Sequence, residues 1–391
     1  MTSSADSGEE QLADDIVPEI PYEAPLPSQR EFLPWHRPRK QFVRQYQWCE
    51  QINRLLTDAP LSDGILKYLG LPGTDLLDLR HFYSSVCEGN DISFRFLGFN
   101  ASARPDSAAQ VELNISLDEV RRLPQVDPRS DVIGDDFALL SKNDSIAWKR
   151  AHELGPFDVI NLDLCDGFGA QTPGSLENDY YNAVNNLMVL QARSPRPWLM
   201  LLTTRADKDN VDLTVLAALV EKYKRNLIDC TDFRTASAVT FNIDDAAKLE
   251  AATHTPSGLL SVFMTGLCKW LLNLGLQHRP QTAVELKSAI GYRVVRTATK
   301  QDLISLALRF TPQFHSISDP MNLATGAGTL LDECKLSTMA LKRAAKLRDA
   351  DHQLACDETL NQAMVNATAA LLSSARYDVD SYREWVEALG A

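Results

Sequence analysis

Acidic and amide side chains follow an apolar run in the middle of the chain. The segment Phe157-Asp-Val-Ile-Asn-Leu-Asp-Leu-Cys-Asp-Gly-Phe-Gly169 reads as a short strand with Asn161, Asp163 and Asp166 at its end. In open α/β sheets ligands bind beyond the carboxyl ends of the strands, so polar groups here are placed for chemistry. Two carboxylates could accept a proton from a nucleophile or bind a divalent cation. Alternatively, Asp163 and Asp166 only cap the next turn or helix.

The elements around this segment alternate between short apolar runs and stretches of helical period, which predicts a sheet flanked by helices. We expect strands at 66–71, 93–99, 131–134, 157–164, 198–203, 292–297 and 303–310. The last two leave no room for a crossover helix, so they must pair antiparallel. Helices are expected over 212–226 and 259–276, and Ser116 with Glu119 has the form of a capping box. The predicted fold class is α/β, a sheet of about seven strands with a terminal antiparallel hairpin and helices on both faces.

Two strings and the order of elements resemble the class I S-adenosylmethionine-dependent methyltransferases, a Rossmann-like family. The strings are Asp131-Val-Ile-Gly-Asp-Asp-Phe137 and Asp158-Val-Ile-Asn-Leu-Asp163. The resemblance covers residues 60–315 and implies that Asp135 or Asp136, with Phe137, serves the adenine of the cofactor. It also implies that Asp163 faces the transferred methyl group. The fourth and fifth strands are similar to those of tRNA guanine-amine methyltransferases.

The sequence departs from the family pattern at several positions. The turn after the first strand reads Leu69-Gly-Leu-Pro-Gly-Thr-Asp75, so Gly70, Gly73 and Thr74 would approach the cofactor in place of a Gly-x-Gly turn. Asn100 stands where the family has an acid for the ribose. S-adenosylmethionine is thus the implied cofactor, and methyl transfer would depend mainly on positioning, with Asp163 receiving a proton.

Basic and aromatic residues alternate in the segment 30–48, which reads REFLPWHRPRKQFVRQYQW. Arg37, Arg39, Lys40 and Arg44 could neutralise phosphates while the aromatic rings stack on bases, as a single-stranded nucleic acid would require. The alternative is structural: two prolines enforce an extended entry, and the rings begin an amphipathic helix that packs on the main domain with its arginines in water.

Composition limits the classes of protein that remain. The 391 residues carry 39 Lys and Arg against 52 Asp and Glu, a net charge of −13, which argues against a generally basic nucleic-acid coat. Residues 1–24 hold seven acids and no Lys or Arg, and they lack the pattern of a secretory signal, so we expect a cytoplasmic protein. Seven scattered cysteines support neither a disulfide framework nor a zinc site. The apolar stretch 259–276 contains polar residues and is expected to be a buried helix, not a membrane span.

The chain therefore divides into four predicted parts: a disordered acidic tail (1–29), a basic and aromatic segment (30–58), a methyltransferase-type domain (59–320) and a C-terminal helical cap (325–391). Nucleic acid is the expected partner of residues 30–48, and a protein partner is expected at the helical cap. Pro34–Lys40 and Asp332–Cys334 are also similar to bacterial proteins encoded near phage-defence or restriction genes.

Three functions remain open. The first is a methyltransferase that acts on nucleic acid. The second is a non-catalytic methyltransferase-fold subunit that binds partners, and the third is a metal-dependent phosphodiesterase that uses Asp163 and Asp166.

Overall fold

The computed structural model describes residues 31–164, 167–170, 180–294, 300–314 and 330–388. Its centre is one eight-stranded sheet with the order β3-β2-β1-β4-β5-β7-β6-β8. The first five strands run parallel, β7 is antiparallel to both β5 and β6, and β8 is parallel to β6. The strands are β1 (Ile65–Gly70), β2 (Ser93–Phe99), β3 (Asp131–Ile133), β4 (Val159–Asp163), β5 (Trp198–Arg205), β6 (Gln281–Tyr292), β7 (Leu303–Gln313) and β8 (Arg348–Asp349).

Helices connect and cover these strands. The α-helices are α2 (Pro38–Val43), α3 (Glu50–Asp58), α4 (Leu77–Phe82), α5 (Ala108–Arg121), α6 (Ile146–Leu154), α7 (Tyr180–Gln191), α8 (Leu213–Asp229), α9 (Thr231–Phe241), α10 (Ala246–Thr253), α11 (Pro256–Gln277), α12 (Glu333–Ala344), α13 (Ala350–Cys356), α14 (Glu358–Ser374) and α15 (Val379–Ala388). Short 3-10 helices are η1 (Pro34–His36), η4 (Glu88–Asn90) and η5 (Phe137–Ser141), while η2 (Arg44–Cys49) and η3 (Tyr83–Cys87) are π-helical.

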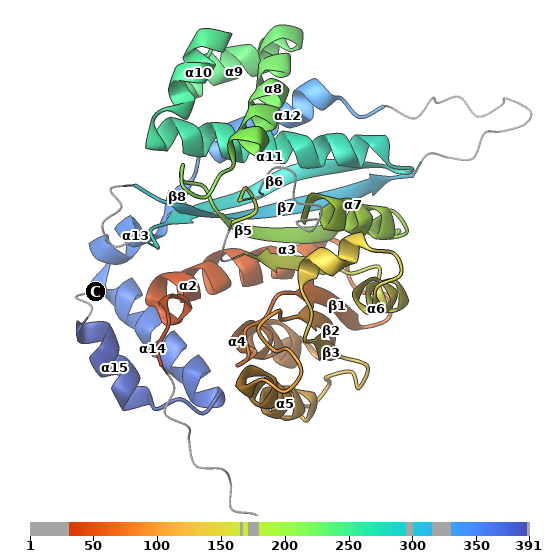
Figure 1. The fold of residues 1–391 in the computed structure, drawn as a ribbon, viewed down its shortest axis with the longest axis vertical. Helices are drawn as coiled ribbons and strands as arrows, with labels where there is room; N and C mark the ends of the chain where they lie inside the picture. The colour runs from red at the N-terminus through yellow and green to blue at the C-terminus, as the bar shows by residue number, and fades with distance from the viewer. Residues whose placement is uncertain (1–30, 165–166, 171–179, 295–299, 315–329, 389–391) are drawn as a thin grey trace, which may run out of the picture.

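The sheet is the middle layer of three (Figure 1). On one face, α2, η2, α3, α4, α5, α13 and α14 contribute side chains to a shared core with β1 and β2. On the other face, α6, α7 and α11 pack against β4, β5 and β7. Because parallel strands are buried on both faces, β2, β4 and β5 are nearly continuous apolar runs.

Most of the predicted strands are confirmed, including the terminal antiparallel pair, but the sixth was placed wrongly. β6 ends at Tyr292, the residue where the predicted strand 292–297 began, and residues 295–297 lie outside the described part of the chain. A bulge between Leu286 and Ser288 interrupts the alternation of buried and exposed side chains in β6, which hid the strand from a period-two search.

The helices expected over 212–226 and 259–276 are confirmed as α8 and α11, but the capping box is wrong. Ser116 lies inside α5 and is fully buried, and the helix begins earlier, where Ser107 Oγ accepts a hydrogen bond from the backbone N–H of Gln110 at 3.1 Å. The apolar period of Leu113, Leu117 and Val120 runs straight through the Ser-x-x-Glu motif, so the motif alone was not sufficient evidence.

The C-terminal helices do not form one cap. In Figure 1, α12 lies beside α11 and the helical insertion α8–α10, whereas α13, α14 and α15 lie near α2 on the other side of the sheet. The insertion has its own small core of Tyr223, Phe233, Leu249 and neighbours, which Leu341 of α12 completes. A disulfide joins Cys230 to Cys334 across 104 residues, which corrects the expectation that the cysteines are unpaired.

Helix α11 is the one described helix that is long and apolar enough, by length and composition, to cross a membrane. In this structure 72% of its most apolar window is buried, against α7, α8, α12 and β6. The expectation of a buried helix is confirmed.

Candidate functional site

The sequence predicts a site at the carboxyl ends of the parallel strands. In the observed sheet order, the acidic residues after β3 and the acidic residue at the end of β4 lie apart. Asp163 ends β4, while Asp135 and Asp136 follow β3, and β2 and β1 lie between these strands. Three strand spacings amount to about 14 Å. The acids of the third and fourth strands are therefore not side by side, and a ligand that met both sets would have to span the ends of β2 and β1.

Asp163 is engaged by a lysine from the N-terminal segment. Lys40 Nζ lies 2.6 Å from Asp163 Oδ2, with 4% of the lysine side chain and 17% of the aspartate side chain exposed. The ammonium also lies 4.5 Å from the centre of the Trp48 ring, a cation–π contact. Lys40 was predicted to meet phosphates from the surface; instead it is buried against the strand end.

The surroundings of Lys40 favour its charged form. Burial by itself would lower the pKa of this ammonium, but electrostatic attraction, chiefly to the carboxylate of Asp163, outweighs burial, and the pKa is raised. The lysine of this pair is therefore held as a cation beside Asp163.

A second buried ion pair lies beside the first. Arg44 Nε donates to Asp78 Oδ1 of α4 at 2.7 Å, with side chains 2% and 9% exposed. Burial raises the pKa of Asp78, but Arg44 and Lys40 outweigh it and the pKa is lowered. Burial, then Arg44, lower the pKa of neighbouring His81 to about 4, so this imidazole is neutral. Arg44, like Lys40, is thus an interior residue and not a surface contact for phosphate.

Gly70 gives room to a tyrosine of its own strand. A Cβ at Gly70 would collide with the Tyr68 hydroxyl, and Tyr68 shares a hydrogen bond with the side chain of Asn161. Asn161 is 1% exposed, and its Oδ1 has no hydrogen-bond partner among the described residues. The absence of a side chain at Gly70 is therefore explained by Tyr68, without a cofactor.

The turn after β1 is tied to the end of β2 by Asn100. Its Nδ2 donates to the Pro72 carbonyl at 3.0 Å, and its Oδ1 accepts from the backbone N–H groups of Ser102 and Ala103. Those hydrogen bonds use the amide that was expected to hold a ribose. Gly73 differs, because nothing lies within 4 Å of a Cβ added there, and Thr74 follows it in the turn.

The residues after β3 have local structural roles. Asp136 Oδ1 caps η5 by accepting from the Ala138 N–H at 2.8 Å, and Phe137 is 3% exposed and packs on Tyr180 at a centroid distance of 5.8 Å. Asp135 is half-buried. The arrangement of Phe137 places its ring in the core, where it cannot cover an adenine in this conformation.

The two remaining basic residues of the N-terminal segment differ from Lys40 and Arg44. Arg39 Nη1 lies 3.1 Å from Asp351 Oδ1 of α13, so it joins the segment to the C-terminal helices. Arg37 is half-buried at the start of α2. The packing of this segment agrees with the structural alternative, except that Arg44 is buried where the arginines were expected in water.

Asp166 lies outside the described residues, so its predicted role beside Asp163 stays a prediction. Within the described part of the chain, no three His, Cys, Asp or Glu side chains are grouped closely enough to hold a metal ion.

S-adenosylmethionine would have to be held by the residues just described, and most of them are engaged elsewhere. Tyr68 fills the space at Gly70, the Asn100 amide is used by the loops, and Phe137 is in the core. Only the open turn at Gly73 keeps the space that a close approach needs. The described residues therefore do not fit the cofactor in this conformation.

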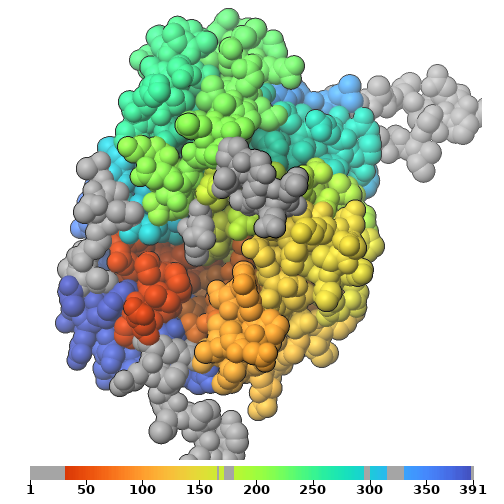
Figure 2. Space-filling model, in the orientation of Figure 1, coloured from red at the N-terminus to blue at the C-terminus, as the bar shows by residue number. Residues whose placement is uncertain are grey.

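Sequence reasoning missed the open hollow of this edge, a groove of about 920 Å³ beside the end of β5. Its walls are α8, α10, the start of α11 and residues 206–211 and 300–302, and its floor includes Leu216, Val220 and Leu249. Figure 2 shows this face of the molecule, which is also hollowed between the red N-terminal helices and the orange and yellow segments. The groove has no short motif, because its lining comes from five separate segments of the chain.

The strand order, with β7 antiparallel between β5 and β6, defines a Rossmann-like methyltransferase-type fold. The chain belongs to the PP_RS20740-like family, whose model matches residues 29–387. Among solved structures, a candidate class I S-adenosylmethionine-dependent methyltransferase from Listeria monocytogenes matches with 10% identity and a TM-score of 0.34, over 77% of this chain and 70% of that one. None of the curated proteins matches.

Proposed function

We propose that this chain is a methyltransferase-fold protein that acts as a non-catalytic interaction subunit. The observation that carries the proposal is the ion pair of Lys40 and Asp163, at 2.6 Å with the lysine 4% exposed. Lys40 occupies Oδ2 of the carboxylate that would have to face a methyl acceptor, so a residue of the chain itself takes up that position. The role of this edge is then to fix the N-terminal segment on the sheet.

The expected partner is a protein that binds the C-terminal helices. α15 presents Asp380, Glu384 and Glu387 on its exposed side, with Arg383 as the counter-charge. This composition suits a basic partner surface, since complementary charge speeds association and sets orientation.

Calorimetric titration with S-adenosylmethionine and S-adenosylhomocysteine tests the proposal. We expect no saturable heat at millimolar ligand for the wild-type chain. Saturable binding that disappears in an Asp135→Ala, Asp136→Ala double variant would contradict the non-catalytic role. A Lys269→Met variant serves as the control, because it also removes a charge but on α11, in an ion pair with Glu333. It shows whether any loss of binding is specific to Asp135 and Asp136.

A second candidate is an S-adenosylmethionine-dependent methyltransferase that acts on a nucleic acid, in a bacterial phage-defence context. Two observations favour it: Asp163 keeps 17% of its side chain exposed, and the bulky residue Leu76 is held at φ 54° in the turn after β1. Strained backbone of this kind concentrates at ligand sites. On this proposal Asp163 would receive the acceptor's proton, and S-adenosylmethionine would supply the methyl group.

A gel-shift assay with single-stranded RNA and DNA at several salt concentrations tests this candidate. Because Lys40 and Arg44 are buried, the informative change is Arg37→Gln with Arg39→Gln. Weaker binding with a shallower salt dependence would support a phosphate contact. Unchanged affinity at every salt concentration would remove residues 30–48 from the candidate interface.

A further inference from the structure

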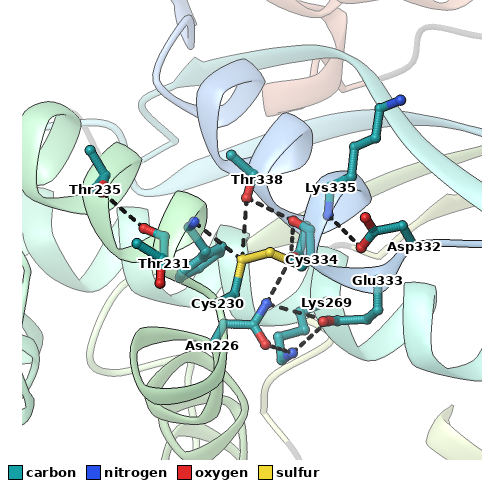
Figure 3. The surroundings of a disulfide bond; sticks show 12 residues. Asn226, Cys230, Thr231, Thr235, Lys269, Asp332, Glu333, Cys334, Lys335 and Thr338 are labelled. Atoms are coloured by element: carbon teal, nitrogen blue, oxygen red, sulfur yellow. Dashed lines mark hydrogen bonds and ion pairs between the residues drawn. A yellow bond between two sulfur atoms is a disulfide. The ribbon is translucent and has the colours of Figure 1, made fainter.

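The disulfide between Cys230 and Cys334 joins two helix N-termini. Cys230 is the N-cap of α9, and its Sγ accepts the backbone N–H of Phe233 at 3.2 Å. Cys334 is the second residue of α12. Figure 3 shows the bond between these helices, with Thr338 on one side and Asn226 and Lys269 on the other. The bond thus links the helical insertion to the segment that leads into β8.

We propose that this bond is a thiol-disulfide switch that is opened by dithiol reductants. Unpaired N–H groups at a helix start stabilise a thiolate, which makes the sulfur a better leaving group and the disulfide easier to reduce. The Phe233 N–H already points at Cys230 Sγ, so the thiolate formed there has a donor in place.

Accessibility decides which sulfur is attacked. Cys230 is 3% exposed, whereas Cys334 is half-buried. A reductant thiolate therefore attacks Cys334 Sγ, the S–S bond breaks, and its electron pair leaves on Cys230 Sγ. The second thiol of the reductant then displaces the Cys334 thiolate, so the dithiol is oxidised to its disulfide and the protein gains two thiols.

Neighbouring charges are arranged so that the acids beside Cys334 do not block this step. Glu333 is paired with Lys269 at 2.6 Å, and Asp332 caps α12 by accepting the Lys335 N–H at 3.1 Å. Both carboxylates are therefore engaged, which lowers their repulsion of an approaching thiolate.

Reduction would act on the groove beside β5 through the insertion. α8 and α10 line the groove, and α9, which joins them, carries the disulfide at its first turn. The core of the insertion is small, so a covalent link to α12 contributes a large share of its order. Without the bond, α12 stays attached through Asn226 to Ser337 at 2.7 Å and Lys269 to Glu333, contacts that open more easily.

Hydrogen exchange of the full wild-type chain, with and without dithiothreitol, tests the switch, and alkylation with mass spectrometry reports the thiols. We expect reduction under native conditions and exchange about tenfold faster in residues 213–253, with α14 unchanged. A bond that survives millimolar dithiothreitol in the folded chain, thiols that are free before any reductant is added, or unchanged exchange after reduction would each overturn the proposal.

A Cys334→Ser variant supplies the second measurement, with Cys356→Ser as its control because Cys356 is exposed and unbonded. The Cys334→Ser chain should reproduce the exchange of the reduced wild type and lose its response to dithiothreitol. If Cys356→Ser also loses that response, the assignment to the Cys230–Cys334 bond is wrong.

Discussion

Lys40, beside β4, and Lys269, on α11, are two buried lysines in similar contacts with opposite electrostatic outcomes. Each Nζ lies 2.6 Å from a carboxylate oxygen, of Asp163 and Glu333 respectively, and the lysine side chains are 4% and 3% exposed. The pKa of Lys40 is nevertheless raised and that of Lys269 lowered.

The difference comes from the charges beyond the first partner. Burial lowers the pKa at both sites. At Lys269 the carboxylate of Glu333 opposes burial, while Lys222 and Arg225 add repulsion. Lys40 has the carboxylate of Asp78 in addition to that of its partner Asp163, and together they prevail over burial. A single close carboxylate does not determine whether a buried lysine is stabilising; the net charge of its surroundings does.

The largest effect is expected at Asp78, the acid shared by both cations near β4. Asp78→Ala leaves Arg44 buried without its partner and should cost about 4 kcal/mol of unfolding free energy, measured with urea. The control is Asp118→Ala, whose partner Arg122 is exposed and whose loss should cost under about 0.5 kcal/mol. Equal losses in the two variants would show that the cluster is not a buried unit.

Next in size is the pH dependence that His81 imparts. The pKa of His81 is about 4 in the folded chain, against 6.5 for an ordinary imidazole. Between pH 6.5 and 4, this imidazole is therefore protonated in the unfolded chain but neutral in the folded chain. Stability therefore falls as the pH drops from 6.5 to 4, by about 3 kcal/mol from this group. A His81→Gln variant should flatten that part of the curve. Parallel curves for variant and wild type would contradict a buried neutral imidazole.

The lysine comparison itself can be tested by Lys40→Met and Lys269→Met. We expect a loss of about 2 kcal/mol at Lys40 and less than about 1 kcal/mol at Lys269, because removing the second ammonium also removes its cost of burial. Thermal or urea unfolding measures both. A larger loss at Lys269 would reverse the comparison.

The smallest change is chemical. Burial raises the pKa of Cys268 to about 12, and burial together with nearby Cys87 does the same for Cys49. Iodoacetamide should therefore modify Cys356, which is exposed, much faster than either. Labelling of Cys49 at the rate of Cys356 would mean that the N-terminal segment opens from the sheet.

Local patterns predicted most of the sheet because its parallel strands are buried on both faces and read as apolar runs. β6 was misplaced since its bulge breaks the alternation. Asn161 and Asp163 were placed correctly at the end of β4 because that strand reads as an apolar run. What surrounds them could not be predicted, because Lys40 reaches Asp163 across 123 residues of sequence.

Long-range pairing also explains the missed disulfide. No short spacing marks Cys230 and Cys334, which lie 104 residues apart and meet only because α9 and α12 pack together. The basic segment was misjudged for a related reason. Charged side chains are normally exposed unless they are paired, and the carboxylates that pair with Lys40 and Arg44 lie far away in the sequence.

The outer side of β6 has a consequence for behaviour at high concentration. This strand has 12 residues, and on its outer side β8 pairs only with Ile290 and Gly291, while Glu285 and Lys287 form an ion pair at 2.6 Å along the strand. A long strand at a sheet margin invites recruitment of a strand from a neighbouring molecule. The charged pair Glu285–Lys287 and the short strand β8 lie where such a strand would have to pair, so we expect them to oppose fibre-like assembly.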